Sequence, residues 1–158
     1  MWPEPVERVA RELRAAAIEA TVQEFPEGTP TAEAAANAVG CRLDQIVKSL
    51  VFVCDDRYVL AMVPGDRRAD EGRVAEAAEA SEVRVARAGE VVEATGFEPG
   101  GVAPFPLAAI EDVFIERTLM QHSRVWIGAG SSAHMAGLAP GELQRLSGAR
   151  TADLVGPR

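Results

Sequence analysis

QIVKSLVFVCDDRYVLAMVPGD, residues 45–66, contains two apolar runs joined by a short polar segment. The runs are residues 47–53 and 58–63, and the polar segment is Asp55, Asp56 and Arg57. Two apolar strands on either side of a tight polar turn predict a β-hairpin. Because nearly every position in both runs is apolar, we expect the strands to be covered on both faces. The hairpin is therefore predicted to run through the core.

Lys48 is set into the first of these strands and is the only lysine of the chain, since the other fifteen basic residues are arginine. A compact ammonium with three rotatable donors fits a small pocket, and burial readily shifts its pKa. The alternative is a lysine at a strand edge whose amine extends to water. These residues alone leave both interpretations open.

Length and composition predict a single domain over residues 1–158. Hydrophobic residues make up 47% and charged residues 25% of the chain, which is typical of a soluble globular protein. No apolar run approaches the roughly 18 residues that a membrane helix needs. The N-terminus, MWPEPVERVAREL, lacks the apolar segment of a signal peptide, so we expect a cytoplasmic protein with no membrane partner.

The chemistry-bearing residues exclude several classes of site. Cys41 and Cys54 are too few and too far apart for a disulfide framework. With only His122 and His134 beside them, no metal-ligand spacing appears, so neither a metal nor another cofactor is expected. The net charge of −8 argues against sequence-independent binding along a nucleic-acid backbone.

Helical patterns and strand patterns both occur along the rest of the chain. Apolar spacing, caps and glycine stops predict the helices, and short apolar runs between turn residues predict the strands. The expected helices are residues 4–20, 31–38, 70–80, 89–95 and 140–148, and the expected additional strands are 21–25, 83–86, 112–116, 124–127, 135–138 and 151–155.

The small-residue segment GAGSSA, residues 128–133, matches the dinucleotide-binding pattern only in its letters. That pattern needs a helix that begins at the loop, and Gly137 and Pro140 interrupt any such helix. Ser131 and Ser132 near His134 do not make a hydrolase triad by themselves, because the G-x-S-x-G elbow is absent. Either serine remains a candidate hydrogen-bond donor to a ligand.

The segment from Gly100 to Pro104 is a second candidate loop. Glycine lets a backbone N–H approach a ligand without a Cβ in the way, and such donors stabilise charge that develops on an ester carbonyl. A tight crossover between two strands explains the same residues equally well.

Several blocks of the sequence together resemble the YbaK/ProX family of freestanding aminoacyl-tRNA deacylases. The blocks are IVKSLVFV, YVLAMVPGDRR, TGFEPGGVAPFPL, VFIERTL, VWIGAG and LAPGELQRLSGA, in the family's order between residues 31 and 155. The family is similar to the editing domain inserted in some bacterial prolyl-tRNA synthetases. The resemblance implies an α/β (α+β) fold in one compact domain, with a mixed, strongly curved or barrel-like sheet surrounded by helices.

The resemblance also implies a site. The family's functional lysine falls on Lys48, and its G-x-x-x-P loop falls on Gly100 through Pro104, so Lys48, Gly100 and Gly101 are the expected catalytic residues. By position, the expected substrate-binding residues are Ser49, Pro104, Gly130, Ser131, Ser132 and His134.

The implied reaction is hydrolysis of the ester that joins a wrong amino acid to the terminal adenosine of a tRNA. The leading hypothesis is a trans-editing enzyme for tRNA-Pro that carries a small wrong amino acid such as alanine or cysteine. Its expected partner is the 3′ end of the mischarged tRNA, and a synthetase is a second candidate partner. The rival hypotheses are a non-catalytic module that recognises a tRNA end, a nucleotide or a synthetase, and a hydrolase of an unrelated small ester.

Overall fold

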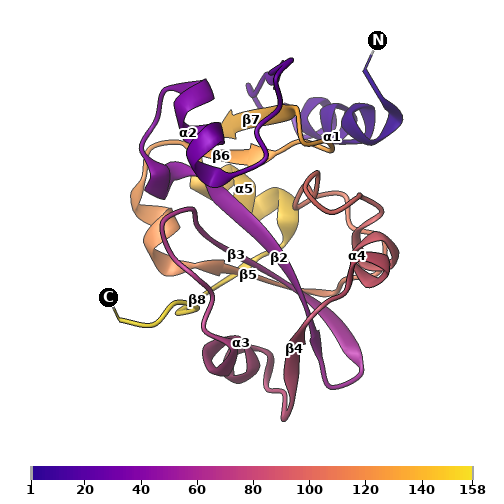
Figure 1. The fold of residues 1–158 in the computed structure, drawn as a ribbon, viewed down its shortest axis with the longest axis vertical. Coiled ribbons are helices and arrows are strands. Elements are labelled where there is room, and N and C mark those ends of the chain that lie inside the picture. The colour runs from indigo at the N-terminus through magenta and orange to yellow at the C-terminus, as the bar shows by residue number, and fades with distance from the viewer. Residues whose placement is uncertain (1, 158) are drawn as a thin grey trace.

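The computed structural model describes residues 2–157, and its longest strands form the predicted hairpin (Figure 1). Strand β2 (Val47–Cys54) pairs antiparallel with β3 (Arg57–Pro64), and Cys54 lies opposite Arg57. Asp55 and Asp56 therefore make a two-residue turn, in which Asp55 has a φ of 55°. The Asp55 carboxylate also accepts hydrogen bonds from the backbone N–H groups of Ser81 and Glu82, which fixes the turn against a neighbouring segment.

The hairpin is the centre of a five-stranded sheet of order β4-β2-β3-β5-β8. Its other members are β4 (Val83–Val85), β5 (Asp112–Glu116) and β8 (Arg150–Ala152). Strand β4 is antiparallel to β2, whereas β5 and β8 continue the sheet in parallel, so the predicted mixed sheet is confirmed.

A second, antiparallel sheet has the order β1-β7-β6. It contains β1 (Val22–Glu24), β7 (His134–Leu138) and β6 (Val125–Gly128). A single bridge between Ile46 and Trp126 connects it to the start of β2. The described strands thus form two sheets and no closed barrel, and the predicted α/β fold with helices around a mixed sheet is confirmed.

Five α-helices surround the sheets within the described residues, together with two short 3-10 helices, Leu43–Gln45 and Arg117–Gln121. The α-helices are α1 (Glu4–Ala15), α2 (Ala32–Val39), α3 (Glu71–Ala78), α4 (Ala88–Thr95) and α5 (Pro140–Ser147). All five α-helices were predicted, but α1 ends earlier than the expected residue 20. Ala17 has a φ of 56°, which a helix does not permit, so the chain turns away there. Ile18, which follows the helix and does not belong to it, is also buried. Apolar spacing therefore continued beyond the helix that it predicted.

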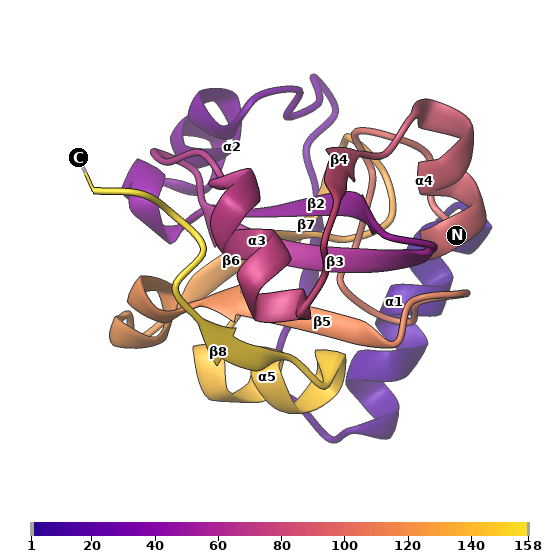
Figure 2. The ribbon, with the colours of Figure 1, turned by 90° about the horizontal axis from the view of Figure 1, so that it is seen from below.

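Both faces of the hairpin are covered, as expected. Val47, Val51, Leu60 and Met62 face the main core, which includes one side of α1, α5 and the smaller sheet. The opposite face packs against α3, which lies across the hairpin in Figure 2. None of the helices in residues 2–157 has the length and apolar character that a membrane crossing requires.

Helix α2 covers the junction of the two sheets, above the start of β2 in Figure 1. The Thr31 side chain caps it by accepting a hydrogen bond from the Ala34 N–H, and Gly40 ends it with a φ of 75°. Ala35 and Ala36 pack in a small cluster with Ile46, Trp126 and Met135. Because the two alanine side chains are small, α2 lies close to Ile46, whose bridge to Trp126 joins the start of β2 to the smaller sheet.

Candidate functional site

A cavity opens beside the first half of β2. Strand β4 pairs only with the last three residues of β2, from Phe52 to Cys54, so residues 47–50 have no partner strand on that side among the described strands. The space has a volume of about 320 Å³ and lies between α2, β2, the Gly100 loop and the β6–β7 turn. Its walls include Thr31, Lys48, Ser49, Gly100, Ser131 and His134.

The Lys48 side chain is half-buried in the wall of this cavity. Its Nζ donates a hydrogen bond to the backbone carbonyl of Arg67, in the segment after β3. Burial lowers the pKa of Lys48 from its ordinary value, and the positive charge of Arg68 lowers it further. The carboxylates of Asp66 and Glu33 oppose this shift. The Lys48 ammonium therefore uses one of its three N–H donors on the Arg67 carbonyl, and the other donors remain for a ligand.

Ser49 follows Lys48 and belongs to the opposite face of the strand. Its hydroxyl oxygen is buried, and no residue in the described chain hydrogen-bonds to it. A buried hydroxyl without a partner loses its hydration and gains nothing in return, so native proteins rarely keep one. Here it borders the cavity, where a ligand can supply the missing hydrogen bond.

Gly100 lines the cavity with a φ of 89°, in the left-handed region that favours glycine. Within residues 2–157 nothing accepts a hydrogen bond from its N–H. The Gly101 N–H, in contrast, donates to the Glu98 carbonyl at 2.9 Å. Gly101 is also packed tightly, because a Cβ there would lie 2.8 Å from the Cα of Ser131. Gly100 thus offers a backbone donor, and Gly101 lets two loops touch.

Helix α1 holds the start of this loop through Arg8. The Arg8 guanidinium donates to the Gly96 carbonyl at 2.7 Å and lies 4.9 Å from the centre of the Phe97 ring. The charge-assisted hydrogen bond and the cation–π contact together fix the residues that lead into Gly100.

Ser131 and His134 contact each other at the β6–β7 turn. Ser131 Oγ lies 2.5 Å from His134 Nδ1 and accepts a hydrogen bond from the Ala133 N–H at 3.0 Å. The His134 ring is only 4% exposed, and its Nε2 lies 3.3 Å from Glu24 Oε2 without hydrogen-bond geometry. Sequence reasoning missed Glu24, because only the pairing of β1 with β7 places Glu24 opposite His134.

The structure divides the predicted site residues into two groups. Lys48, Ser49, Gly100, Ser131 and His134 all line the cavity, whereas Gly101, Pro104, Gly130 and Ser132 do not. Gly101, Gly130 and Ser132 of the second group instead contact segments next to the cavity. A Cβ on Gly130 would lie 2.7 Å from the backbone of Pro5, and the Ser132 carbonyl accepts hydrogen bonds from the N–H and hydroxyl of Thr29. Pro104, at the end of the glycine loop, is buried.

Comparison with known proteins assigns the chain to a family. Residues 26–146 match the family model described as the aminoacyl-tRNA editing domain. The chain belongs to the aminoacyl-tRNA editing domain family. The match includes β2, the glycine loop and the β6–β7 turn, but it leaves out α1 and β1.

Relatives of this editing domain occur both as short proteins and inside larger enzymes. The uncharacterized protein YwhH of Bacillus subtilis is 34% identical over 127 residues, which cover 80% of each chain. Proline--tRNA ligase of Lactobacillus johnsonii is 33% identical over 105 residues, which are 66% of this chain but only 19% of the ligase. A crystal structure described as a candidate trans-editing enzyme for prolyl tRNA synthetase aligns with a TM-score of 0.92 and 34% identity, over 99% of this chain and 100% of that one.

The editing domain shows no cluster of three or more metal-ligating side chains within its described residues. Of its two cysteines, Cys54 is buried, and burial raises the pKa of its thiol. Cys54 therefore remains a neutral core residue.

Proposed function

We propose that this editing domain acts in trans and hydrolyses the ester of mischarged aminoacyl-tRNA, with tRNA-Pro carrying alanine or cysteine as its substrate. The observation that carries the proposal is that Lys48 and Gly100, from segments far apart in the chain, border one cavity of about 320 Å³. Membership of the editing-domain family and the likeness to proline--tRNA ligase support it.

The proposed reaction adds water to the ester carbonyl and releases a free amino acid and an uncharged tRNA. The Gly100 N–H donates to the carbonyl oxygen as negative charge develops there. Lys48 binds the terminal phosphate or ribose, which holds the ester in place for the attacking water. A covalent nucleophile on the protein is unnecessary, because an aminoacyl ester is already activated.

The size of the cavity sets the proposed selectivity. Small aminoacyl groups enter beside β2, and larger ones meet the walls that Ile46, Val102 and Met135 contribute. A single methylene changes binding by only about 1–3 kcal/mol, so a cavity of this kind separates near neighbours in size modestly. We therefore expect graded rates across alanine, cysteine, serine and proline.

The decisive experiment is a deacylation panel on tRNA-Pro charged with each of these four amino acids. We expect hydrolysis of the alanyl or cysteinyl ester, and a fall in kcat/KM of about 100-fold or more in Lys48→Ala, comparable to the loss of a transition-state donor. Arg14→Ala, which removes an exposed arginine from α1, is the matched charge control.

Two outcomes would overturn the proposal. Binding of the charged tRNA without hydrolysis of any ester would indicate a recognition module. Hydrolysis of simple alkyl esters as fast as aminoacyl-tRNA would indicate a general esterase. An undiminished rate in Lys48→Ala would remove the role assigned to that side chain.

A further inference from the structure

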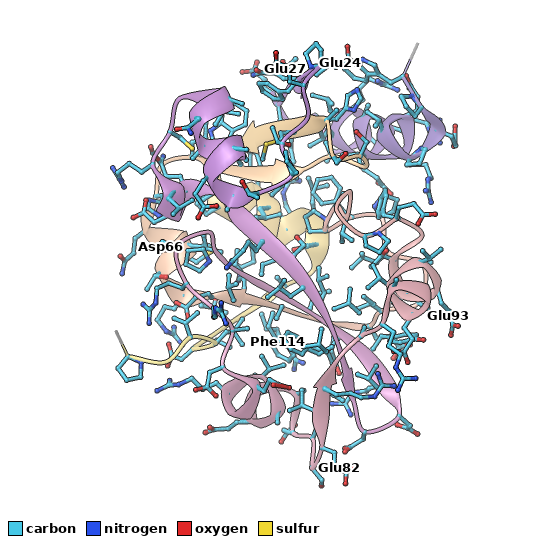
Figure 3. All side chains as sticks on the ribbon, in the orientation of Figure 1. Glu24, Glu27, Asp66, Glu82, Glu93 and Phe114 are labelled. Atoms are coloured by element: carbon cyan, nitrogen blue, oxygen red, sulfur yellow. The ribbon has the colours of Figure 1, made fainter. Side chains whose placement is uncertain are left out.

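Three polar side chains follow one another from the protein surface into the cavity wall. Glu24 belongs to β1, at the end of the molecule where Figure 3 labels it beside Glu27. Its carboxylate lies 3.3 Å from His134 Nε2, and His134 Nδ1 lies 2.5 Å from Ser131 Oγ, which borders the cavity. The family match begins at residue 26, so Glu24 lies outside it.

The order of these groups determines where the histidine proton resides. A neutral imidazole carries one N–H, and the groups beside its two nitrogens select the tautomer. The Glu24 carboxylate lies 3.3 Å from Nε2, and its negative charge favours an N–H at that nitrogen over a lone pair. His134 Nδ1 is then an acceptor, and the Ser131 hydroxyl must donate its proton to it.

This tautomer changes what Ser131 offers to a ligand. One oxygen lone pair accepts the Ala133 N–H at 3.0 Å, and the hydroxyl proton is engaged by His134. The acceptor position that remains belongs to an atom in the cavity wall. With the opposite tautomer, Ser131 would instead present a donor, so Glu24 decides the polarity of this wall without touching the ligand.

We propose that Ser131 accepts a hydrogen bond from the α-ammonium of the aminoacyl group, and that Glu24 is the positioning residue that fixes His134 for this purpose. This inference rests on the proposed function, because it concerns the substrate of the same cavity. The negative charge of Glu24 adds a favourable field for an ammonium. Lys48 then receives the anionic end of the substrate, and Ser131 its cationic end, so the ester enters in one direction.

The first test reads the tautomer directly by NMR of isotope-labelled histidine nitrogens. The chain has only two histidines, so His122→Gln assigns the His134 signals without ambiguity. We expect a protonated Nε2 and a bare Nδ1 in the wild type. Glu24→Ala should shift His134 towards the other tautomer, whereas Glu27→Gln, an exposed carboxylate nearby, should not. A protonated Nδ1 in the wild type, as neutral imidazole or imidazolium, would overturn the proposal.

The second test measures binding of two stable amide analogues, and it requires no hydrolysis. One is adenosine with alanine attached to the ribose through an amide, and the other carries a propionyl group, which lacks the amine and adds no bulk. We expect the wild type to prefer the alanyl analogue by about tenfold or more, the range of a hydrogen bond to a charged group. Ser131→Ala should lose this preference, and Ser123→Ala, an exposed serine on the loop before β6, should keep it.

The outcomes separate this inference from the proposed function. If no ester is hydrolysed but the preference and the tautomer are as expected, the recognition role stands and the enzymatic one fails. If Ser131→Ala keeps the preference for the ammonium, or weakens the binding of both analogues equally, the inference on Ser131 fails. The proposed hydrolysis of aminoacyl-tRNA is not contradicted by that result. Detection of an acyl group covalently attached to Ser131 would also overturn it, because that serine would be a nucleophile.

Discussion

Glu116 and His134 are both buried polar side chains, 2% and 4% exposed, but their surroundings differ. Glu116 Oε1 accepts hydrogen bonds from the N–H groups of Leu154 and Val155, and its Oε2 accepts from Thr118 at 2.7 Å. His134 Nε2 has no hydrogen bond within the described chain, and the nearby Ser49 hydroxyl has none either.

The difference separates a polar group that stabilises the fold from polar groups that are candidates for contact with a ligand. A buried carboxylate with three backbone donors ties β5 to the segment after β8, and both of its oxygens accept hydrogen bonds from the chain itself. Around the cavity, hydrogen-bonding capacity is unfilled. An unfilled buried group costs free energy, and we therefore infer that a ligand in the cavity completes the hydrogen bonding of the Ser49 hydroxyl.

The largest effect on stability is expected at Glu116, the buried side chain whose hydrogen bonds are all made within the chain. Glu116→Ala leaves three N–H groups without an acceptor, each at a cost of about 1–3 kcal/mol, so we expect the free energy of unfolding to fall by at least about 3 kcal/mol. Urea denaturation measures this loss, and Glu116→Gln, which keeps an acceptor oxygen, should lose less. A loss under about 1 kcal/mol in the alanine variant would mean that the three hydrogen bonds of Glu116 do not stabilise the fold, which would remove the contrast with His134.

The next effect concerns the contact between the two cavity loops. In Gly101→Ala the new Cβ would lie 2.8 Å from Ser131 Cα, and we expect about 1–3 kcal/mol of destabilisation together with slower deacylation. Gly89→Ala in α4 is the control, because its Cβ meets nothing within 4 Å and alanine favours a helix. Thermal unfolding and kcat/KM would be measured for both, and equal behaviour would contradict the role of Gly101.

Ser49→Ala removes a buried hydroxyl that has no hydrogen bond, and its expected effect on stability is opposite to that of Glu116→Ala. Removing a buried hydroxyl that has no partner should leave stability unchanged or raise it by about 1 kcal/mol, while deacylation falls. Ser147→Ala provides the contrast, since its hydroxyl donates to the Leu143 carbonyl at 2.7 Å and its loss should cost about 1 kcal/mol. Chemical denaturation of the two variants decides the matter, and a clear destabilisation in Ser49→Ala would show that its hydroxyl serves the fold.

The smallest effect is the pH dependence that Lys48 imposes. Its pKa lies below the ordinary 10.5, chiefly through burial, so between the lowered value and 10.5 the unfolded chain binds more protons than the folded one. Stability that depends on Lys48 should therefore rise with pH across this window, relative to Lys48→Met. Its contribution to activity as a cation should decline over the same window. Denaturation and rate profiles at alkaline pH test both, and coincident stability profiles would contradict the shift.

The fold was largely readable because its signals are local. Uninterrupted apolar runs identified β2 and β3, and Thr31 with Gly40 marked the ends of α2 within a residue or so. The end of α1 was not readable, because Ala17 adopts a positive φ that nothing in its own residue type requires.

The site was readable only in part because its remaining signals are not local. Gly100 and Gly101 are neighbours with the same side chain, yet one lines the cavity and the other packs on Ser131, a distinction that depends on a loop about thirty residues away. Glu24 was missed for the same reason, since it meets His134 only through the pairing of β1 with β7.

Helix α1 lies outside the matched residues 26–146, yet Arg8 and Pro5 brace both loops that flank the cavity. A fragment cut at the borders of the shared domain would lose these braces and uncover the apolar side of the core that Val6, Val9 and Leu13 close. A substitution in α1 would therefore act on the cavity through the positions of its loops, without altering a single residue of the cavity wall.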